Sequence, residues 1–203
     1  MDELRETSRP ESLRGHFLIA ETELQDPNFF RTVVLIIHHN EEGAFGLVVN
    51  RGSEVTVGEV IEGADESPIA DLPLMVGGPV QQNYVFALHS GIPEAYRSEH
   101  TEEPAPGVFF EPSFQHVIDY VESEAYMSRP IDDREKIVVY AGYSGWGPEQ
   151  LEFELDEEAW LIHPAAADVV FQSNPSEGWK DALSKKGGFY RIVAETGYKP
   201  SRN

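Results

Sequence analysis

The stretch Gly15–Gly52, GHFLIAETELQDPNFFRTVVLIIHHNEEGAFGLVVNRG, carries three apolar runs separated by polar turns. The runs Phe17–Ala20, Thr32–Ile37 and Ala44–Val49 have the length and the β-branched content of strands. Only the four residues Asn40–Gly43 separate the last two runs, so the pattern predicts a hairpin. The runs are apolar without clean alternation, which indicates strands covered on both faces, by helices or by closure of the sheet on itself.

The rest of the chain mixes strand and helix patterns without a strict alternation. Capping, proline and glycine signals predict helices at Thr56–Gly63, Ser113–Ala125 and Asn174–Gly187. The Gly147-Pro148-Glu149 start favours another helix from Gly147 onward, although the alternation of Leu151, Phe153 and Leu155 alone would suggest a strand. Further strands are expected at Leu74–Val76, Tyr84–Leu88, Val108–Phe110, Lys136–Ala141 and Phe189–Val193, with a long exposed loop at Pro93–Pro106. Short turns join several of the strands, so we expect an α+β fold with a mostly antiparallel sheet flanked by helices.

The length of 203 residues and an apolar content of 40% fit a single domain. Residues 1–14 are charged and lack periodicity, so we expect a mobile acidic tail followed by one domain over residues 15–203. No apolar run approaches the roughly 20 residues that span a bilayer, and the N-terminus has no apolar signal-peptide core. The chain has no cysteine, which is compatible with a reducing compartment. We therefore expect a cytoplasmic protein.

The formal net charge is −21, from 15 basic and 36 acidic residues. Nucleic-acid backbones and anionic membranes attract proteins through lysine and arginine, so this charge argues against direct nucleic-acid binding and against membrane binding. The acids also cluster: six of the ten residues from Glu149 to Glu158 are acidic and none is basic. We interpret this cluster as a solvated surface, with a basic protein partner as the alternative.

Three further blocks complete the pattern that begins with Gly15–Gly52. They are GGPV at Gly77–Val80, the pair Leu88-His89, and GYSGWGPEQLE at Gly142–Glu152. In this order and spacing the chain resembles the YqgE/AlgH family of small bacterial proteins, from about His16 to the end. The resemblance implies a complex α/β arrangement whose sheet is strongly curved and barrel-like, and glycines would permit the bends of such a sheet. The family has no agreed biochemical activity and is associated with transcriptional control.

The segment Gly142–Gly147 lies between an expected strand and an expected helix, where a serine nucleophile would sit. A nucleophile elbow needs glycine two residues after the serine, and here that position is Trp146. The segment also lacks the Gly-Lys-Ser/Thr of a phosphate loop. Members of the family that this chain resembles often carry alanine at the position of Ser144, so the resemblance implies no role for a serine there. We therefore expect no catalytic serine, and we expect Trp146 to pack in the core, with a ligand platform as the alternative.

The seven histidines do not predict a metal site. His38 and His39 are adjacent at a strand end, so their side chains point to opposite faces. The other histidines lack the spacing of metal ligands on a helix, and there is no thiolate. We expect neither a metal nor a cofactor, and we interpret His89 as hydrogen-bonded at a strand end or, alternatively, as part of a ligand site.

Two arginines flank the central hairpin of an otherwise acidic molecule. If the strands are antiparallel, Arg31 lies beside Arg51 and the pair could bind a carboxylate or phosphate. The favoured alternative is that both guanidinium groups fix the turns by pairing with Asp26, Glu21 or Glu23.

These arguments predict no catalytic residue and nine candidate ligand-binding residues: Arg31, Asn50, Arg51, Gly77, Gly78, His89, Ser144, Gly145 and Trp146. The absence of a complete catalytic motif favours a ligand- or protein-binding module with an indirect regulatory role, and the resemblance supports that role. Its partner would be an unknown protein or a small anionic ligand. The alternative is an enzyme that acts on a small phosphorylated or carboxylated metabolite.

Overall fold

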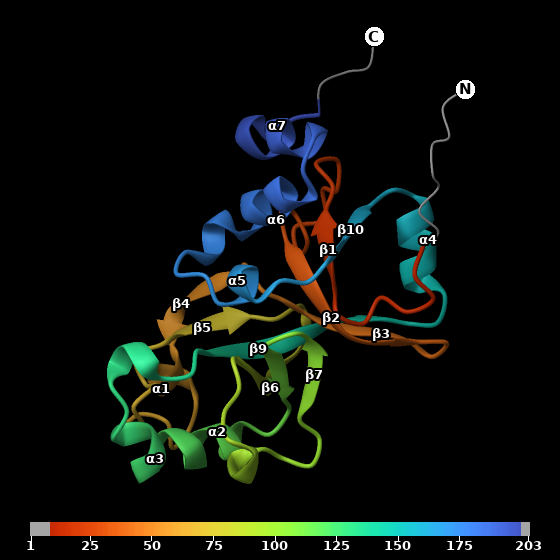
Figure 1. Cartoon of the computed structure of the whole chain (residues 1–203). Helices are drawn as coiled ribbons and strands as arrows, with labels where there is room; N and C mark the ends of the chain where they lie inside the picture. Colours follow the sequence, from red (N-terminus) through yellow and green to blue (C-terminus); the bar gives the residue numbers. More distant parts are fainter. Residues whose placement is uncertain (1–8, 200–203) are drawn as a thin grey trace, which may run out of the picture.

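The structure is a computed structural model that describes residues 9–199 (Figure 1). Ten strands form one sheet with the order β10-β1-β2-β3-β9-β6-β8-β7, and β4 and β5 join it beside β9. The strands are β1 (His16–Ala20), β2 (Val33–Asn40), β3 (Gly43–Val48), β4 (Gly52–Thr56), β5 (Pro73–Val76), β6 (Val80–His89), β7 (Glu102–Ala105), β8 (Val108–Glu111), β9 (Ile137–Trp146) and β10 (Trp160–Pro164).

Helices surround this sheet on several sides (Figure 1). They are α1 (Val57–Val60), α2 (Phe114–Val121), α3 (Glu124–Met127), α4 (Gln150–Asp156), α5 (Ala167–Val170), α6 (Gly178–Lys186) and α7 (Phe189–Thr196). Single 3-10 turns lie at η1 (Glu94–Tyr96), η2 (Ile131–Asp133) and η3 (Pro175–Glu177). In Figure 1, α6 and α7 lie at the opposite end of the molecule from α2 and α3, and α4 covers a third side.

Strand β9 is the centre of the sheet. Its first half pairs antiparallel with β6 and parallel with β5, and its last residues pair antiparallel with β3. The pairing of β5 with β9 is the one parallel contact among the strands that the structure describes. The sheet curls into a half-barrel (Figure 1). The predicted α+β fold with a strongly curved, mostly antiparallel sheet is confirmed.

The predicted hairpin is confirmed, and its burial explains why the runs do not alternate. Strand β2 pairs with β3 from Val34↔Val48 to Asn40↔Gly43. Along β1, Phe17 packs in a core cluster with helices α5 to α7, whereas the next residue, Leu18, packs in a second cluster with α4. Both faces of these strands are therefore covered. A third cluster packs the β6–β9 pair against α2.

The structure corrects three of the expected elements. The segment Phe189–Val193, predicted as a strand, begins helix α7, which buries Val193 and Ala194. The expected loop at Pro93–Pro106 contains η1 and the edge strand β7. Strand β9 continues through Gly142–Trp146, so this segment is part of a strand rather than a turn before a helix.

The N-terminal boundary also differs from the expectation. Of the expected tail, residues 1–8 lie outside the described residues. Leu13 is fully buried, and its backbone N–H donates a hydrogen bond to His39 Nδ1 at 3.0 Å. Arg9 forms an ion pair with Asp156 at 2.8 Å. Leu13 therefore packs beside β2 as part of the domain and Arg9 contacts α4, whereas the remaining residues from 10 to 14 are exposed.

Two absences apply to residues 9–199. In this part of the chain no helix is long and apolar enough to cross a membrane. The same residues hold no group of three or more histidine, aspartate or glutamate side chains placed to bind a metal ion.

Candidate functional site

Asn50 follows strand β3 and links it to the start of strand β2 at the open end of the hairpin. Its Oδ1 accepts a hydrogen bond from Val33 N at 2.7 Å, and its Nδ2 donates to Arg31 O at 2.9 Å. Arg31 has a positive φ of 54°, and its guanidinium lies 5.2 Å from the ring centroid of Trp179. Arg31, Asn50 and Arg51 therefore lie together at one end of the sheet.

The partners of Arg51 differ from the predicted carboxylates. Its Nη1 donates to the carbonyl oxygen of Asn28 at 2.7 Å and its Nη2 to that of Phe30 at 3.4 Å. Burial lowers the pKa of Arg51, although the nearby charge of Asp26 opposes this effect. The other two expected partners, Glu21 and Glu23, form ion pairs with Lys199 instead, at 2.9 Å and 3.6 Å. Arg51 therefore fixes the turn through backbone carbonyl groups.

The contacts of Arg51 predict a structural defect in Arg51→Met. We expect the free energy of unfolding to fall by about 1–2 kcal/mol, because two carbonyl groups lose a charged donor. Urea denaturation measures this loss. Arg191→Met is the control, because Arg191 is exposed on α7 and its side chain makes no hydrogen bond or ion pair within the described residues. Unchanged stability in Arg51→Met, together with loss of a phosphate-induced stabilisation seen in the unmodified protein, would contradict the structural role.

The glycine pair Gly77-Gly78 marks a close crossing of two backbones. Gly77 N donates to Ala141 O at 2.9 Å, and Gly77 O accepts from Val48 N at 2.8 Å and from Ser144 Oγ at 3.2 Å. Ser144 is fully buried. A Cβ atom on Gly78 would overlap backbone atoms of Tyr143. Gly77, Gly78 and Ser144 therefore serve the packing of two backbone segments against each other, and their contacts at this crossing are with the protein's own chain.

Trp146 and Gly145 end strand β9. Trp146 is 5% exposed, and its Nε1 donates to Glu154 at 2.9 Å; the same carboxylate accepts from Trp160 Nε1 at 2.8 Å. Gly145 is exposed and pairs with Phe45 of β3. The indole of Trp146 therefore packs between α4 and the sheet, as the packing interpretation expects.

His89 is the last residue of β6 and is fully buried. It pairs with Ile137, which lies at the opposite end of β9 from Trp146. Its Nδ1 accepts hydrogen bonds from Gly91 N at 3.2 Å and Ile92 N at 3.1 Å, and its ring stacks on Phe109 with 5.4 Å between centroids. Its Nε2 has no hydrogen-bond partner in the described part of the chain. Burial, followed by the charge of Arg97, lowers the pKa of His89 from 6.5 to about 4, so the ring is neutral at pH 7.

The nine predicted residues do not form one pocket. His89 pairs with Ile137, whereas Ser144 lies seven residues further along β9. At about 3.3 Å per residue this separation is roughly 23 Å of strand. The hairpin cluster and the glycine crossing are neighbours, because Val76 N donates to Arg51 O at 2.9 Å, but their side chains are engaged in contacts within the protein.

A groove of about 740 Å³ lies elsewhere, and sequence reasoning did not find it. It collects side chains from the segment before β5, from β5, from α3 to the start of β9, and from the α5–η3 connection. None of the nine predicted residues lines it. Its apolar wall consists of Pro68, Ile69, Leu72, Pro73, Met75, Tyr126, Ile131, Ile137, Val138, Phe171 and Pro175.

Three consecutive charged residues, Arg134, Glu135 and Lys136, line the same groove. The carboxylate of Glu135 accepts hydrogen bonds from Tyr120 and Arg129. Burial and the hydrogen bond with Glu135 both raise the pKa of the Tyr120 hydroxyl, which therefore stays protonated as a donor. The side chain of Lys136 makes no hydrogen bond or ion pair within residues 9–199. The groove therefore combines an apolar wall, an acid that is already paired with Arg129 and Tyr120, and a lysine ammonium group without a partner in the described residues.

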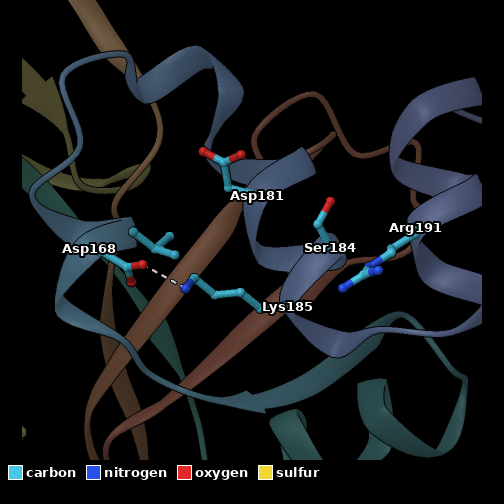
Figure 2. A pocket seen from close by; sticks show the side chains of 6 residues that line it. Asp168, Asp181, Ser184, Lys185 and Arg191 are labelled. Atoms are coloured by element: carbon cyan, nitrogen blue, oxygen red, sulfur yellow. Dashed lines mark hydrogen bonds and ion pairs between the residues drawn. The ribbon is translucent and has the colours of Figure 1, made fainter.

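A second, polar cleft of about 430 Å³ lies between α5, α6 and α7 (Figure 2). Asp168 and Lys185 form an ion pair across it at 2.6 Å, and Asp181, Ser184 and Arg191 complete its polar lining. The hydrogen bond from Lys185 lowers the pKa of Asp168, although burial opposes this effect. The two cations and two carboxylates of this cleft balance each other, so it offers no net charge to a ligand.

Comparisons with known proteins place the chain. A sequence profile described as AlgH-like matches residues 17–191. The UPF0301 protein Tgr7_2910 of Thioalkalivibrio sulfidiphilus is 38% identical over 176 residues, which cover 85% of this chain and 89% of that protein. The UPF0301 protein CT0663 of Chlorobaculum tepidum is 34% identical over 189 residues, which cover 93% of this chain and 95% of that protein.

Two solved structures share the fold. The crystal structure of protein DIP2367 from Corynebacterium diphtheriae has a TM-score of 0.69 at 23% identity, with 92% of each chain covered, and supports the fold alone. The solution structure of the AlgH protein from Pseudomonas aeruginosa also has a TM-score of 0.69, at 31% identity, covering 96% of this chain and 98% of that one. With the profile match and the full-length relatives, these likenesses show that the chain belongs to the AlgH-like family, DUF179.

Proposed function

We propose that this protein is a small-molecule-binding module and that the 740 Å³ groove is its binding site. The main support for this proposal is the composition of the groove. Its wall is mainly apolar with a few charged groups, and its volume is typical of ligand sites. A regulatory role would then be indirect, with ligand occupancy changing how the protein meets a partner. The net charge of −21 supports this over direct contact with DNA.

The lining favours binding over catalysis. General acid–base chemistry needs a proton-transferring group within hydrogen-bond reach of the substrate. The acid at this groove, Glu135, already accepts from Tyr120 and Arg129. Ser173 is the one serine in the lining, and its hydroxyl makes no hydrogen bond to a histidine or carboxylate in the described residues. The enzymatic alternative therefore has no supporting constellation at this site.

A plug at the rim tests the groove. Ser173 is exposed and lines it, so Ser173→Trp is expected to fill part of the groove without disturbing the core. The measurement is a screen of small apolar and amphipathic fragments by amide chemical shifts of the full chain. We expect fragments to shift the amides of Ile137, Val138 and Phe171 in the unmodified protein, and we expect at least tenfold weaker binding in Ser173→Trp, because the indole occupies the ligand's volume.

The matched control is Ser176→Trp, because Ser176 is exposed three residues later in the chain and does not line the groove. It should bind fragments as the unmodified protein does. Fragments that shift amides elsewhere, or equal binding by both tryptophan variants, would count against the groove as the site.

A further inference from the structure

The charges at the groove single out one kind of ligand headgroup. Arg134 and Lys136 are its cations, and Glu135 is its only acid among the lining residues. Glu135 is held by Arg129 and by the hydroxyl of Tyr120, so its negative charge is largely compensated. Cations therefore outnumber acids among the lining residues of this groove, on a chain with a net charge of −21. An anionic headgroup fits it better than a neutral or cationic one.

The backbone around Lys136 holds this residue at the rim. Its N–H donates to Ser90 Oγ at 2.9 Å, and its carbonyl oxygen accepts from Ser90 N at 3.0 Å. Its ammonium group has no partner within residues 9–199, so it keeps three donors for a ligand. The backbone position of Lys136 is therefore fixed by its pairing with Ser90, while the donors of its ammonium group remain available.

Arg134 supplies a second, partly engaged cation. Its Nε donates to Arg129 O at 3.2 Å, its Nη2 donates to Met127 O at 3.3 Å, and its guanidinium lies 4.7 Å from the ring centroid of Tyr126. These contacts fix the plane of the guanidinium and leave Nη1 without a hydrogen bond in the described residues. A fixed arginine with free donors suits a carboxylate.

The apolar wall describes the rest of the ligand. Leu72, Met75, Val138 and Phe171 lie in or against the core clusters, and each presents some surface to the groove. Ile131 at the rim is 79% exposed, so apolar surface remains uncovered beside the cations. Covering such surface is favourable by about 25 cal/mol per Å². A flexible hydrocarbon tail can follow this open, irregular wall.

We propose that the ligand of the groove is a free anionic amphiphile, a medium-chain carboxylate in its simplest form, with its tail along the apolar wall and its headgroup at Lys136 and Arg134. This proposal rests on the proposed function, because it names the ligand class of the same site. The strong negative charge of the protein disfavours an anionic lipid surface as the source of that headgroup.

Three eight-carbon probes that differ in their headgroup test the proposal. The ¹⁵N-labelled full chain is titrated at pH 7 with octanoate, octanol and octylamine, which are anionic, neutral and cationic. We expect octanoate to bind about tenfold more tightly than octanol, equivalent to about 1.4 kcal/mol for a charged hydrogen bond, and octylamine to bind most weakly. Lys136→Gln should weaken octanoate binding and leave octanol binding unchanged, with Arg134 retaining part of the preference for the anion. Lys136→Glu should reverse the order of octanoate and octylamine.

Lys180→Gln is the matched control, because Lys180 is an exposed lysine of α6 that pairs with Glu177 away from the groove. It should leave all three affinities unchanged. Equal binding of octanoate and octanol, or an unchanged octanoate affinity in Lys136→Gln, would overturn the anionic headgroup while the groove stayed a binding site. Binding of octanoate only when aggregated would overturn the free amphiphile. If none of the three probes shifts the groove amides, the proposed function itself fails with this ligand class.

Discussion

Gly77→Ala is expected to lose about 4 kcal/mol or more of its free energy of unfolding, enough to unfold a typical domain of this size. An added Cβ at Gly77 would overlap the carbonyl oxygen of Gly142 and lie 2.9 Å from Leu47 Cδ2. The oxygen belongs to the central strand β9 and cannot move without breaking the pairing of Gly77 N with Ala141 O. Urea denaturation, or the yield of folded protein, measures the loss.

Gly52→Ala is the matched control for this clash. Neither Gly52 nor Gly77 has a positive φ, so both substitutions are neutral in backbone strain. At Gly52 the nearest heavy atom to an added Cβ is Met75 Sδ at 3.9 Å, an ordinary contact. We expect stability unchanged or raised by about 0.4–1 kcal/mol, because alanine restricts the unfolded chain. Similar losses in both variants would show that the close crossing at Gly77 is not the cause.

The second large effect is a loss of stability in mild acid that depends on His89. The pKa of His89 is about 4 in the folded protein, below the ordinary value of 6.5, so the unfolded chain binds a proton more readily. The stabilising contribution is therefore complete above pH 6.5 and is lost as the pH falls from 6.5 to about 4. Between pH 7 and pH 5 the loss is about 2 kcal/mol, and over the full range it approaches about 3 kcal/mol.

His89→Asn isolates this effect. Asparagine keeps a neutral acceptor for the N–H groups of Gly91 and Ile92 but has no proton to gain. The charged groups that influence His89, namely Arg97, Glu111 and Glu135, remain in both proteins and cancel in the comparison. We expect the variant to be less stable at pH 7, because the smaller side chain leaves space beside Phe109, and to lose about 2 kcal/mol less between pH 7 and pH 5. Parallel pH dependence of the two proteins would contradict the buried neutral histidine.

Local signals in the sequence predicted those elements whose causes are local. The Pro148-Glu149 start, together with the family resemblance, predicted helix α4. The capping box of Thr56 with Glu59 predicted α1. Helix α7 was misassigned because Phe189–Val193 is short and rich in apolar and aromatic residues, and such a run suits either state until its neighbours are known. In the fold it packs on α6, and only that contact decides which of its residues are buried.

Strand β10 is an element that local sequence signals did not predict. Trp160–Pro164 carries a histidine and a proline and gave no clear strand pattern, yet it pairs with all of β1 from His16↔Pro164 to Ala20↔Trp160. Its conformation depends on an available edge of the sheet, which lies about 140 residues away in the sequence.

The sequence by itself determined the family, the curved α+β fold and the central hairpin, and it placed Arg31, Asn50 and Arg51 at one end of that hairpin. The family and the curvature of the sheet rest on the resemblance of sequence blocks spread between Gly15 and Glu152. The mixture of helices and strands and the central hairpin rest on periodicity, turns and capping groups, which act over a few positions. Only the tertiary structure decided that Gly77 and Gly78 pack against the part of β9 where Ser144 is buried. It also decided that His89 of β6 lies beside the other end of β9, and that a groove opens beside Lys136. The groove collects residues from three stretches between Pro68 and Pro175, and the curl of the sheet brings them together. No local sequence pattern predicts that these three stretches line one groove, because their proximity depends on how distant strands pair.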